Sequence, residues 1–454
     1  MEVKINRLMI AAPTSGSGKT TVVCGLLKAL LNQQLNTVAF KSGPDYIDPM
    51  FHSKVIGAKS RNLDLFLLGK EITKYLLVRN ANKADIAILE GAMGFYDGLG
   101  PDTRASAYEL AQVTQTPVVL LINAKGAALS LAAIIKGFKD FRSDSNIQGV
   151  ILNNVNPMTY AYYKEALERE TGVPLLGYFP HLAECNLESR HLGLVTAEEV
   201  QNLQDIIASL ATQATKTLNL PALLALAEQA PPLSYTDIKV QPLGDVTIAV
   251  AQDKAFCFYY QDALDLLAEL GAQLVSFSPL ADKKLPSCDG VILGGGYPEV
   301  YATQLSENKE LRLDLSDKIA AGLPTLAECG GFMYLLDKFV GNEQEYAWVG
   351  AVTGSSSMTK KLNRFGYITL TAQKDNMLCH AGDTINAHEF HYSDSTNNGV
   401  DFVAAKNTGK RSWPCIHATS SLYAGYPHMH LWGNRNFAIN FIKACLHYKD
   451  EGTR

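Results

Sequence analysis

A cysteine followed by two glycines stands at the end of a short apolar run, in Leu323-Pro-Thr-Leu-Ala-Glu-Cys-Gly-Gly-Phe-Met-Tyr-Leu335. The apolar run predicts a buried strand, and a helical pattern begins directly after the glycines, which is the layout of a nucleophile elbow. Amide groups at the start of that helix favour the thiolate form of the sulfur. Cys329 is therefore a candidate nucleophile.

Two other segments supply what a cysteine nucleophile needs. The run Asp289-Gly-Val-Ile-Leu-Gly-Gly-Gly-Tyr-Pro-Glu299 predicts a strand that ends in three glycines. Their amides, together with that of Gly330, are suited to an oxyanion hole. The segment Ala424-Gly-Tyr-Pro-His-Met-His-Leu431 offers two imidazoles that can exchange a proton with the sulfur. We expect His428 to be the base and keep His430 as the second choice; a structural role is the alternative for either ring.

A second chemistry is indicated near the start of the chain, in Ala12-Pro-Thr-Ser-Gly-Ser-Gly-Lys-Thr-Thr21. The segment follows a predicted strand and opens a predicted helix, as a phosphate-binding loop does. The residues expected to bind ATP here are Thr14, Ser15, Gly16, Ser17, Gly18, Lys19, Thr20 and Thr21. Thr20 would also bind Mg²⁺. Pro13 occupies the usual first glycine position, and the alternative interpretation is a simple glycine–serine turn before a helix.

Acidic residues follow two further predicted strands, in Phe40-Lys-Ser-Gly-Pro-Asp-Tyr-Ile-Asp-Pro49 and Ile88-Leu-Glu-Gly-Ala-Met-Gly-Phe-Tyr-Asp-Gly98. The carboxyl ends of parallel strands meet at one edge of a sheet, where ligands bind. We expect Asp45 and Glu90 to bind Mg²⁺ with Thr20. The residues expected on the nucleotide or substrate side are Lys41, Asp48 and Asp97. Solvated turn carboxylates are the alternative for any one of them.

The elements that must position these residues predict two α/β domains. Apolar runs at 7–12, 37–40, 85–89, 117–123 and 147–153 alternate with helical patterns such as 19–32 and 127–141. Such alternation predicts a parallel sheet that is covered on both faces. A Pro-rich stretch without periodicity predicts a linker at 227–243, between domains at 1–226 and 244–454. The second domain begins a new α/β series, and its pattern after Gly350 indicates antiparallel strands before a last helix at 435–448.

Composition limits the classes of function. The 454 residues are 47% hydrophobic and 19% charged, with a formal charge of -5, so a globular protein is indicated and nucleic acid is not an expected partner. No apolar run has membrane-spanning length, and the first residues do not form a signal-peptide core. The eight cysteines contain no Cys-x-x-Cys pair, which favours reduced thiols and a cytoplasmic location.

These motifs together resemble the cobyrinate a,c-diamide synthases, glutamine-dependent amidoligases of corrin biosynthesis. The resemblance extends over nearly the whole chain and includes Ala387-His-Glu-Phe-His-Tyr-Ser393. It implies a dethiobiotin-synthetase-like phosphate-loop domain followed by a class I glutamine amidotransferase domain. It also implies that Cys329 and His428 split glutamine, and that ATP activates the a and c acetate groups of cobyrinate. The segment from His388 could line the acceptor pocket or belong to the core.

The sequence leaves several alternatives open. Related enzymes amidate hydrogenobyrinate or nickel sirohydrochlorin, whose acetate groups are comparable. A phosphate-loop switch ATPase with an inactive amidotransferase domain is a different class of function, disfavoured because Thr14 stands where such switches carry an extra lysine. A homodimer is left open. Related glutaminase domains carry a glutamate two residues after the catalytic histidine, but His430 stands there, so the third member of the triad is not identified.

Overall fold

The computed structural model describes residues 1–182, 197–342 and 344–452. The chain divides into two compact units, Met1–Ile238 and Lys239–Arg454. The first unit continues past residue 226 because strand β9 (Leu233–Ser234) returns to pair with β1 (Glu2–Val3). The division therefore lies inside the Pro-rich stretch that the sequence marks as a linker.

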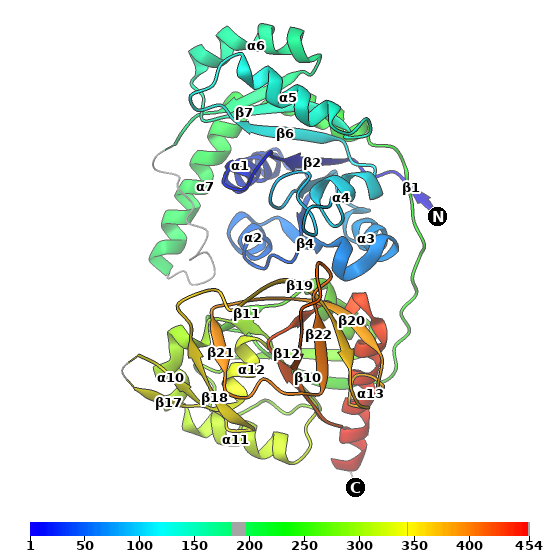
Figure 1. Ribbon diagram of the computed structural model, residues 1–454, viewed down its shortest axis with the longest axis vertical. Coiled ribbons are helices and arrows are strands. Elements are labelled where there is room, and N and C mark those ends of the chain that lie inside the picture. The colour runs from blue at the N-terminus through cyan, green and yellow to red at the C-terminus, as the bar shows by residue number, and fades with distance from the viewer. Residues whose placement is uncertain (183–196, 343, 453–454) are drawn as a thin grey trace. The chain divides into compact units, whose positions relative to one another are not determined.

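The N-terminal unit is built on a seven-stranded sheet in which every neighbouring pair is parallel (Figure 1). In spatial order its strands are β4 (Lys59–Leu63), β3 (Thr37–Ser42), β5 (Ile86–Glu90), β2 (Arg7–Ala11), β6 (Val118–Asn123), β7 (Ile147–Asn153) and β8 (Leu175–Phe179). All residues of β2 and β5 are buried, as expected for central strands covered on both faces.

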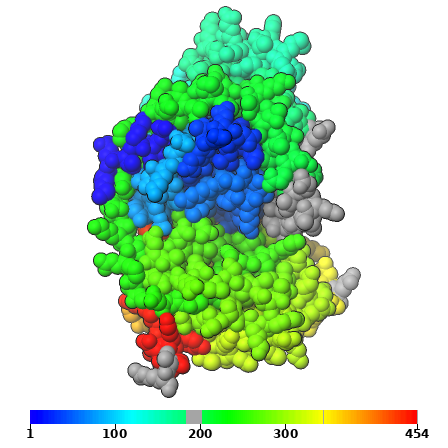
Figure 2. Space-filling model, turned by 180° about the vertical axis from the view of Figure 1, so that it is seen from behind, coloured from blue at the N-terminus to red at the C-terminus, as the bar shows by residue number. Residues whose placement is uncertain are grey.

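The helices of this unit follow the strands in sequence. They are α1 (Lys19–Asn32), α2 (Ile47–Phe51), α3 (Leu65–Ala81), α4 (Ala107–Val113), α5 (Ser130–Asp140), α6 (Pro157–Thr171), α7 (Ala197–Thr217) and α8 (Leu220–Glu228). A π-helical turn, η1 (His52–Ile56), directly continues α2. Buried side chains of α1, α7 and α8 form one core cluster with β2, and Figure 2 shows the green residues of α7 and α8 beside the blue start of the chain.

The C-terminal unit begins with a six-stranded sheet. Its strands, in spatial order, are β12 (Ala272–Phe277), β10 (Val246–Ala251), β13 (Gly290–Leu293), β15 (Thr325–Glu328), β25 (Leu422–Gly425) and β24 (His417–Ala418). All neighbours are parallel except the last pair. The helices are α9 (Gln261–Glu269), α10 (Ala302–Glu307), α11 (Lys309–Ala320), α12 (Gly330–Leu335) and α13 (Arg435–Gly452), with the 3₁₀ turns η3 (Pro298–Tyr301) and η4 (Leu431–Gly433).

Two smaller sheets and one short strand pair complete this unit. An antiparallel sheet has the order β23 (Ser412–Cys415), β22 (Phe402–Ala405), β19 (Arg364–Ala372), β20 (Thr384–His391) and β26 (His428–Met429). A mixed sheet has the order β17 (Glu345–Ala347), β16 (Leu336–Val340), β18 (Val352–Met358) and β21 (Ser393–Ser395). The pair is β11 (Phe256–Phe258) with β14 (Gly295–Gly296).

The two-domain α/β class predicted from the sequence is confirmed, including the antiparallel strands after Gly350. Strands β4 and β8, at the two edges of the first sheet, were not predicted. Lys59–Leu63 is polar, with Lys, Ser, Arg and Asn before its single Leu, so it lacks the apolar run of a central strand. Within the described ranges, no helix is both long and apolar enough to cross a membrane.

Candidate functional site

The predicted phosphate loop connects β2 to α1 and is shaped by glycines with positive φ. Gly16 has a φ of 73° and Gly18 a φ of 87°, which favour glycine. A Cβ on Gly18 would lie 2.3 Å from Nδ2 of Asn153, whose amide donates a 2.8 Å hydrogen bond to the Ser17 carbonyl. The loop is therefore held from the end of β7, and only glycine fits at residue 18.

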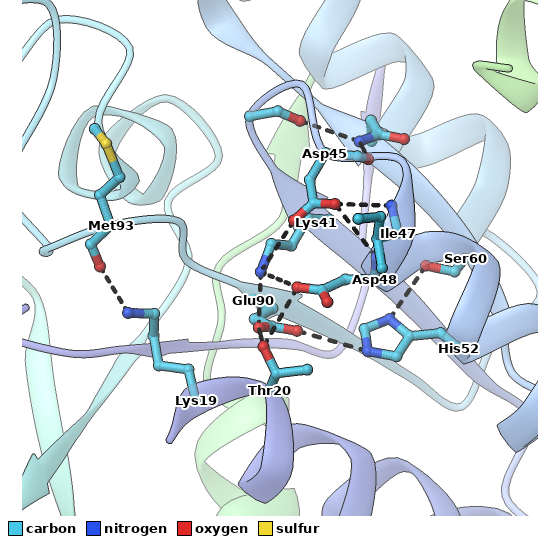
Figure 3. Close-up of polar contacts among 12 residues, drawn as sticks. Lys19, Thr20, Lys41, Asp45, Ile47, Asp48, His52, Ser60, Glu90 and Met93 are labelled. Carbon is cyan, nitrogen blue, oxygen red and sulfur yellow. Dashed lines mark hydrogen bonds and ion pairs between the residues drawn. The ribbon is translucent and has the colours of Figure 1, made fainter. Parts of the chain in front are cut away.

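Lys19 is the first residue of α1, and its ammonium group is anchored above the loop. Its Nζ donates to the carbonyl of Met93 at 2.6 Å (Figure 3). It also donates to the carbonyl of Thr14 at 3.2 Å. Burial, with a contribution from the charge of Lys41, lowers the pKa of Lys19 to about 8. Thr14, Ser15 and Gly16 are exposed, so this side of the loop is open to a ligand.

Four side chains meet at the carboxyl ends of β3 and β5, next to the loop. Thr20 Oγ1 donates to Glu90 Oε1 at 2.8 Å and lies 3.3 Å from Asp48 Oδ2. Lys41 Nζ bonds to Asp48 and, at 2.8 Å, to Glu90 Oε1. Figure 3 shows the lysine between the two carboxylates. We call Thr20, Lys41, Asp48 and Glu90 the acidic cluster.

The charges of this cluster depend on one another. Burial disfavours the charge on Lys41, but the carboxylates of Glu90, Asp48 and Asp45 outweigh it and raise the lysine pKa. Burial acts against the charge of Asp48, yet Lys41 holds the pKa of that carboxyl below its ordinary value. For Glu90 burial prevails and raises the pKa.

His52, from η1, adds a buried imidazole that the sequence did not indicate. Its Nε2 lies 3.6 Å from Glu90 Oε2, and its Nδ1 lies 3.4 Å from Ser60 Oγ. Burial lowers the pKa of His52 to about 4, so the ring is neutral. Short π-helical turns such as η1 are frequent at functional sites.

The other two predicted acidic residues lie outside the acidic cluster. Asp45 Oδ1 accepts the amides of Ile47 at 2.8 Å and Asp48 at 3.3 Å, so it caps α2, and its Oδ2 is 4.0 Å from Lys41. Asp97 is exposed, and its Oδ2 accepts the Gly94 amide at 3.0 Å. Asp48 therefore occupies the place beside Thr20 that the sequence interpretation gave to Asp45.

The acidic cluster suits a hard cation. Its donors are a hydroxyl and two carboxylates, and Glu90 Oε2 is a buried oxygen without a hydrogen bond among the described residues. Among the residues that the structure describes, no group of three or more His, Cys, Asp or Glu side chains is arranged so that it could hold a metal ion. Mg²⁺ takes one or two carboxylates and fills its remaining positions with water and phosphate, so the residues fit this ion.

In the C-terminal unit the predicted elbow is present between β15 and α12. Cys329 has a φ of 49° and a ψ of -107°, a strained conformation for a residue with a Cβ. Its amide donates to the Gly425 carbonyl of β25 at 2.8 Å, which fixes the turn to the neighbouring strand. The sulfur-bearing residue is mostly buried, with 8% of its surface exposed.

The imidazole of His428 lies within hydrogen-bonding reach of the Cys329 thiol. On its other side, His428 Nδ1 is 3.6 Å from Glu328 Oε2. Burial opposes a charge on the ring, but the interactions with Cys329 and Glu328 prevail and raise the pKa of His428 to about 10. An imidazole that favours its charged form thus lies between Cys329 and Glu328, which suits nucleophilic chemistry.

His430, the second choice from the sequence, has a different environment. Its ring stacks on Tyr260 with centroids 4.7 Å apart, and its Nδ1 accepts the Trp432 amide at 3.3 Å. Burial lowers the pKa of His430 to about 3. The structure therefore favours His428 as the partner of Cys329 and gives His430 a role in capping η4.

The glycine-rich strand end lies directly beside this pair. A Cβ on Gly295 would lie 2.5 Å from Cε1 of His428, and a Cβ on Gly330 would lie 3.2 Å from the Gly296 nitrogen. The backbones of Gly330 and Gly296 therefore lie next to each other at the elbow, and their amides are candidates for an oxyanion hole.

Comparison with known proteins agrees with both sites. Residues 8–195 match the family model of a CobQ/CobB/MinD/ParA nucleotide binding domain, and residues 247–436 match that of a CobB/CobQ-like glutamine amidotransferase domain. A cobyrinate a,c-diamide synthase from Caldanaerobacter subterraneus is 37% identical over 96% of this chain and 98% of that protein. The chain belongs to the cobyrinate a,c-diamide synthase family.

Two further members of this family show the same full-length similarity. The cobyrinate a,c-diamide synthase from Listeria innocua is 38% identical over 95% of this chain and 97% of its own length. The one from Thermoplasma volcanium is 39% identical over 98% of both chains. The similarity therefore covers both units and is not limited to either motif.

Three residues at the two sites were not identified from the sequence: Asn153, His52 and Glu328. Asn153 and His52 carry no local motif, because their importance depends on which elements are neighbours in the fold. Glu328 precedes the cysteine directly, and an acidic residue at a strand end was the available signal.

Proposed function

We propose that this protein uses ATP and glutamine to amidate the a and c acetate carboxylates of cobyrinate. One observation supports this proposal most strongly: a single chain carries both a phosphate loop beside a lysine-bridged pair of carboxylates and a cysteine–imidazole pair at an elbow. The first arrangement suits activation of an acid by phosphate, and the second suits release of ammonia from an amide. The choice of cobyrinate as the acceptor is based on the names of the relatives given above.

In the N-terminal unit, a carboxylate oxygen of the acceptor attacks the γ-phosphorus of ATP, which gives an acyl phosphate and ADP. The loop amides and Lys19 would hold the phosphates, because the loop is exposed and the ammonium group lies above it. Thr20, Asp48 and Glu90 would hold Mg²⁺, which supplies positive charge to the phosphates when bound. Lys41 would balance the charge of the two carboxylates, and Asp45 would orient α2.

In the C-terminal unit, the Cys329 thiolate attacks the side-chain amide carbon of glutamine, and the amides of Gly330 and Gly296 would stabilise the oxyanion. His428 gives its proton to the departing nitrogen, which leaves as ammonia, and a thioester remains. Water, deprotonated by His428, then hydrolyses the thioester to glutamate. The ammonia attacks the acyl phosphate and forms the amide with release of inorganic phosphate.

The acceptor is tested by offering cobyrinate, hydrogenobyrinate and nickel sirohydrochlorin side by side with ATP, Mg²⁺ and glutamine. We expect mass spectrometry to detect two new amide groups on cobyrinate. Two amides on another acceptor instead would reassign the substrate within the same chemistry. ATP consumption without amidation of any acceptor, and only on self-association, would favour the switch ATPase instead.

The nitrogen source is tested in the same assay with Cys329→Ala. This variant should lose at least about 10³-fold of glutamine-dependent amidation and keep amidation with added ammonium, because only the nucleophile is removed. Loss of both activities in a folded variant would contradict the proposal that glutamine hydrolysis and amidation take place at separate sites. We further propose that the enzyme is cytoplasmic. Whether it forms a homodimer is tested by size-exclusion chromatography with light scattering.

A further inference from the structure

The glutaminase site lacks the carboxylate that related domains place two residues after the catalytic histidine. His430 occupies that position, is fully buried, and contacts Tyr260 and the Trp432 amide. An imidazole that takes and returns a proton needs a partner at its far nitrogen, which fixes its tautomer and stabilises its charge. The structure offers such a partner at another place in the sequence.

That partner is Glu328, the last residue of β15. One carboxylate oxygen, Oε2, forms an ion pair of 3.6 Å with His428 Nδ1, and the other, Oε1, accepts the Met429 amide at 3.0 Å. The carboxylate therefore contacts two consecutive residues of β26. Because it lies at Nδ1, the other ring nitrogen, Nε2, is available to the sulfur.

The side chain that stacks on the His428 ring helps to fix its position without supplying a negative charge. His388, opposite it in the β20–β26 register, stacks on the ring with centroids 5.0 Å apart and planes inclined by 12°. Tyr260 holds His388 by a 2.8 Å hydrogen bond at Nε2. Burial keeps His388 neutral by lowering its pKa well below the ordinary value. Glu389, the next residue, pairs with Arg364 at 3.6 Å.

We propose that Glu328 is the third member of the glutaminase triad, a positioning residue that holds His428 in its productive tautomer and stabilises its positive charge. The nucleophile and the residue that orients its base are thus adjacent in sequence. Glu328 takes no part in the proton transfers themselves: His428 gives its Nε2 proton to the leaving nitrogen and regains one from the attacking water. The inference rests on the glutamine chemistry of the proposed function and is independent of which acceptor is amidated.

Glu328→Gln separates the charge from the packing, because the amide oxygen can still accept from Met429 while the negative charge is lost. We expect kcat/KM for glutamine hydrolysis to fall about 10²- to 10⁴-fold. We also expect the alkaline limb of its pH profile to move to lower pH by at least about one unit, since the imidazolium loses its counter-charge. Glu328→Asp, which keeps the charge at a shorter reach, should restore part of both.

The matched control is Glu389→Gln, which removes another buried carboxylate of the same unit. The groups that interact with His428 are Cys329 and Glu328 at the elbow and, on β20, His388, Glu389 and His391. The Glu389 carboxylate pairs with Arg364, so Glu389→Gln should move the alkaline limb less than Glu328→Gln does. An equal shift in both variants, or an unchanged profile in Glu328→Gln, would overturn the assignment of Glu328.

A second measurement does not depend on turnover. The rate of Cys329 alkylation by iodoacetamide, followed by peptide mass spectrometry, should show an alkaline step where His428 loses its proton and the thiolate becomes more nucleophilic. This step should lie at lower pH in Glu328→Gln than in the wild type. An identical step in both proteins would refute the proposal even if no acceptor is ever amidated, so its failure is distinct from that of the proposed function. Circular dichroism and thermal unfolding verify that each variant is folded.

Discussion

Each unit contains a buried histidine paired with a buried glutamate at the same distance, but the two pairs have opposite charge states. In the N-terminal unit His52 Nε2 lies 3.6 Å from Glu90, and in the C-terminal unit His428 Nδ1 lies 3.6 Å from Glu328. The pKa of His52 is lowered to about 4, whereas that of His428 is raised to about 10. Distance to a carboxylate therefore does not decide whether an imidazole is charged.

The balance between burial and the other neighbours of each ring decides it. Burial lowers the pKa of His52, and Lys41, which lies against the same carboxylates, adds its own positive charge. Burial also opposes the charge of His428, but there the interactions with Cys329 and Glu328 outweigh burial. Burial therefore keeps the ring beside the phosphate loop neutral, whereas the cysteine and the glutamate keep the ring beside the nucleophile charged.

The largest effect is expected from Lys41→Met. Removing the lysine leaves Glu90 and Asp48 buried without a cation, which should cost the N-terminal unit about 3–5 kcal/mol of unfolding free energy. The measurement is urea denaturation at pH 8 and pH 5, and the loss should be smaller at pH 5 because the carboxylates can take up protons there. Lys74→Met, which breaks the partly exposed 2.9 Å pair with Glu71, is the control and should cost less than about 1 kcal/mol. Equal losses would show that Lys41 is not what compensates the buried carboxylates.

The next effect separates the roles of the two glutamates. Glu90→Gln should reduce amidation about 10²-fold or more with either glutamine or ammonium as the nitrogen source. The reason is that the proposed Mg²⁺ site would lose a negatively charged ligand, which the phosphoryl transfer needs. Glutamine hydrolysis without acceptor should stay within about twofold of the wild type. Asp45→Asn can keep the cap of α2 and should reduce amidation less. If Asp45→Asn is as damaging, Asp45 belongs with the metal ligands after all.

The smallest effect concerns the neutral ring. Because its folded pKa of about 4 is below the ordinary value, His52 is protonated in the unfolded chain before it is protonated in the native one. Stability of the N-terminal unit should therefore fall as pH drops from about 6.5 to 4, with up to about 3 kcal/mol due to this residue. His52→Gln should remove that part of the slope in denaturation curves at several pH values, and His447→Gln, on an exposed ring, should not. An unchanged slope in His52→Gln would show that this ring is charged in the native state.

Most of the fold was predictable because its central strands are continuous apolar runs. The strand Ile147–Asn153 was placed correctly to the residue, and the strand Gly290–Leu293 lies directly before the three glycines, as predicted. The edge strand Lys59–Leu63 was missed because half-buried edges do not need apolar runs. The extension of the first unit to Ile238 depends on β9 pairing with β1, a contact between distant parts of the sequence.

The sites were predictable where one local segment contains the chemistry. The phosphate loop and the Cys329 elbow each combine a strand end, a turn and a helix start. The choice between Asp45 and Asp48 was not predictable, because both follow the same strand. Their roles differ because Asp45 lies before α2 and caps it, whereas Asp48 lies within α2 and faces Thr20. The Glu328–His428 pair joins β15 to β26, a contact between residues far apart in the sequence.

The positive φ of Cys329 has a consequence for how the elbow can change. Consecutive residues of a regular strand project from opposite faces of a sheet. A carboxylate and a sulfur at neighbouring positions would therefore ordinarily lie on opposite sides of it. The reversed backbone at residue 329 brings both to the same ring. If that one dihedral angle relaxed into the extended region, the carboxylate of Glu328 and the sulfur of Cys329 would separate. Glutaminase activity would then be lost although every side chain is still present.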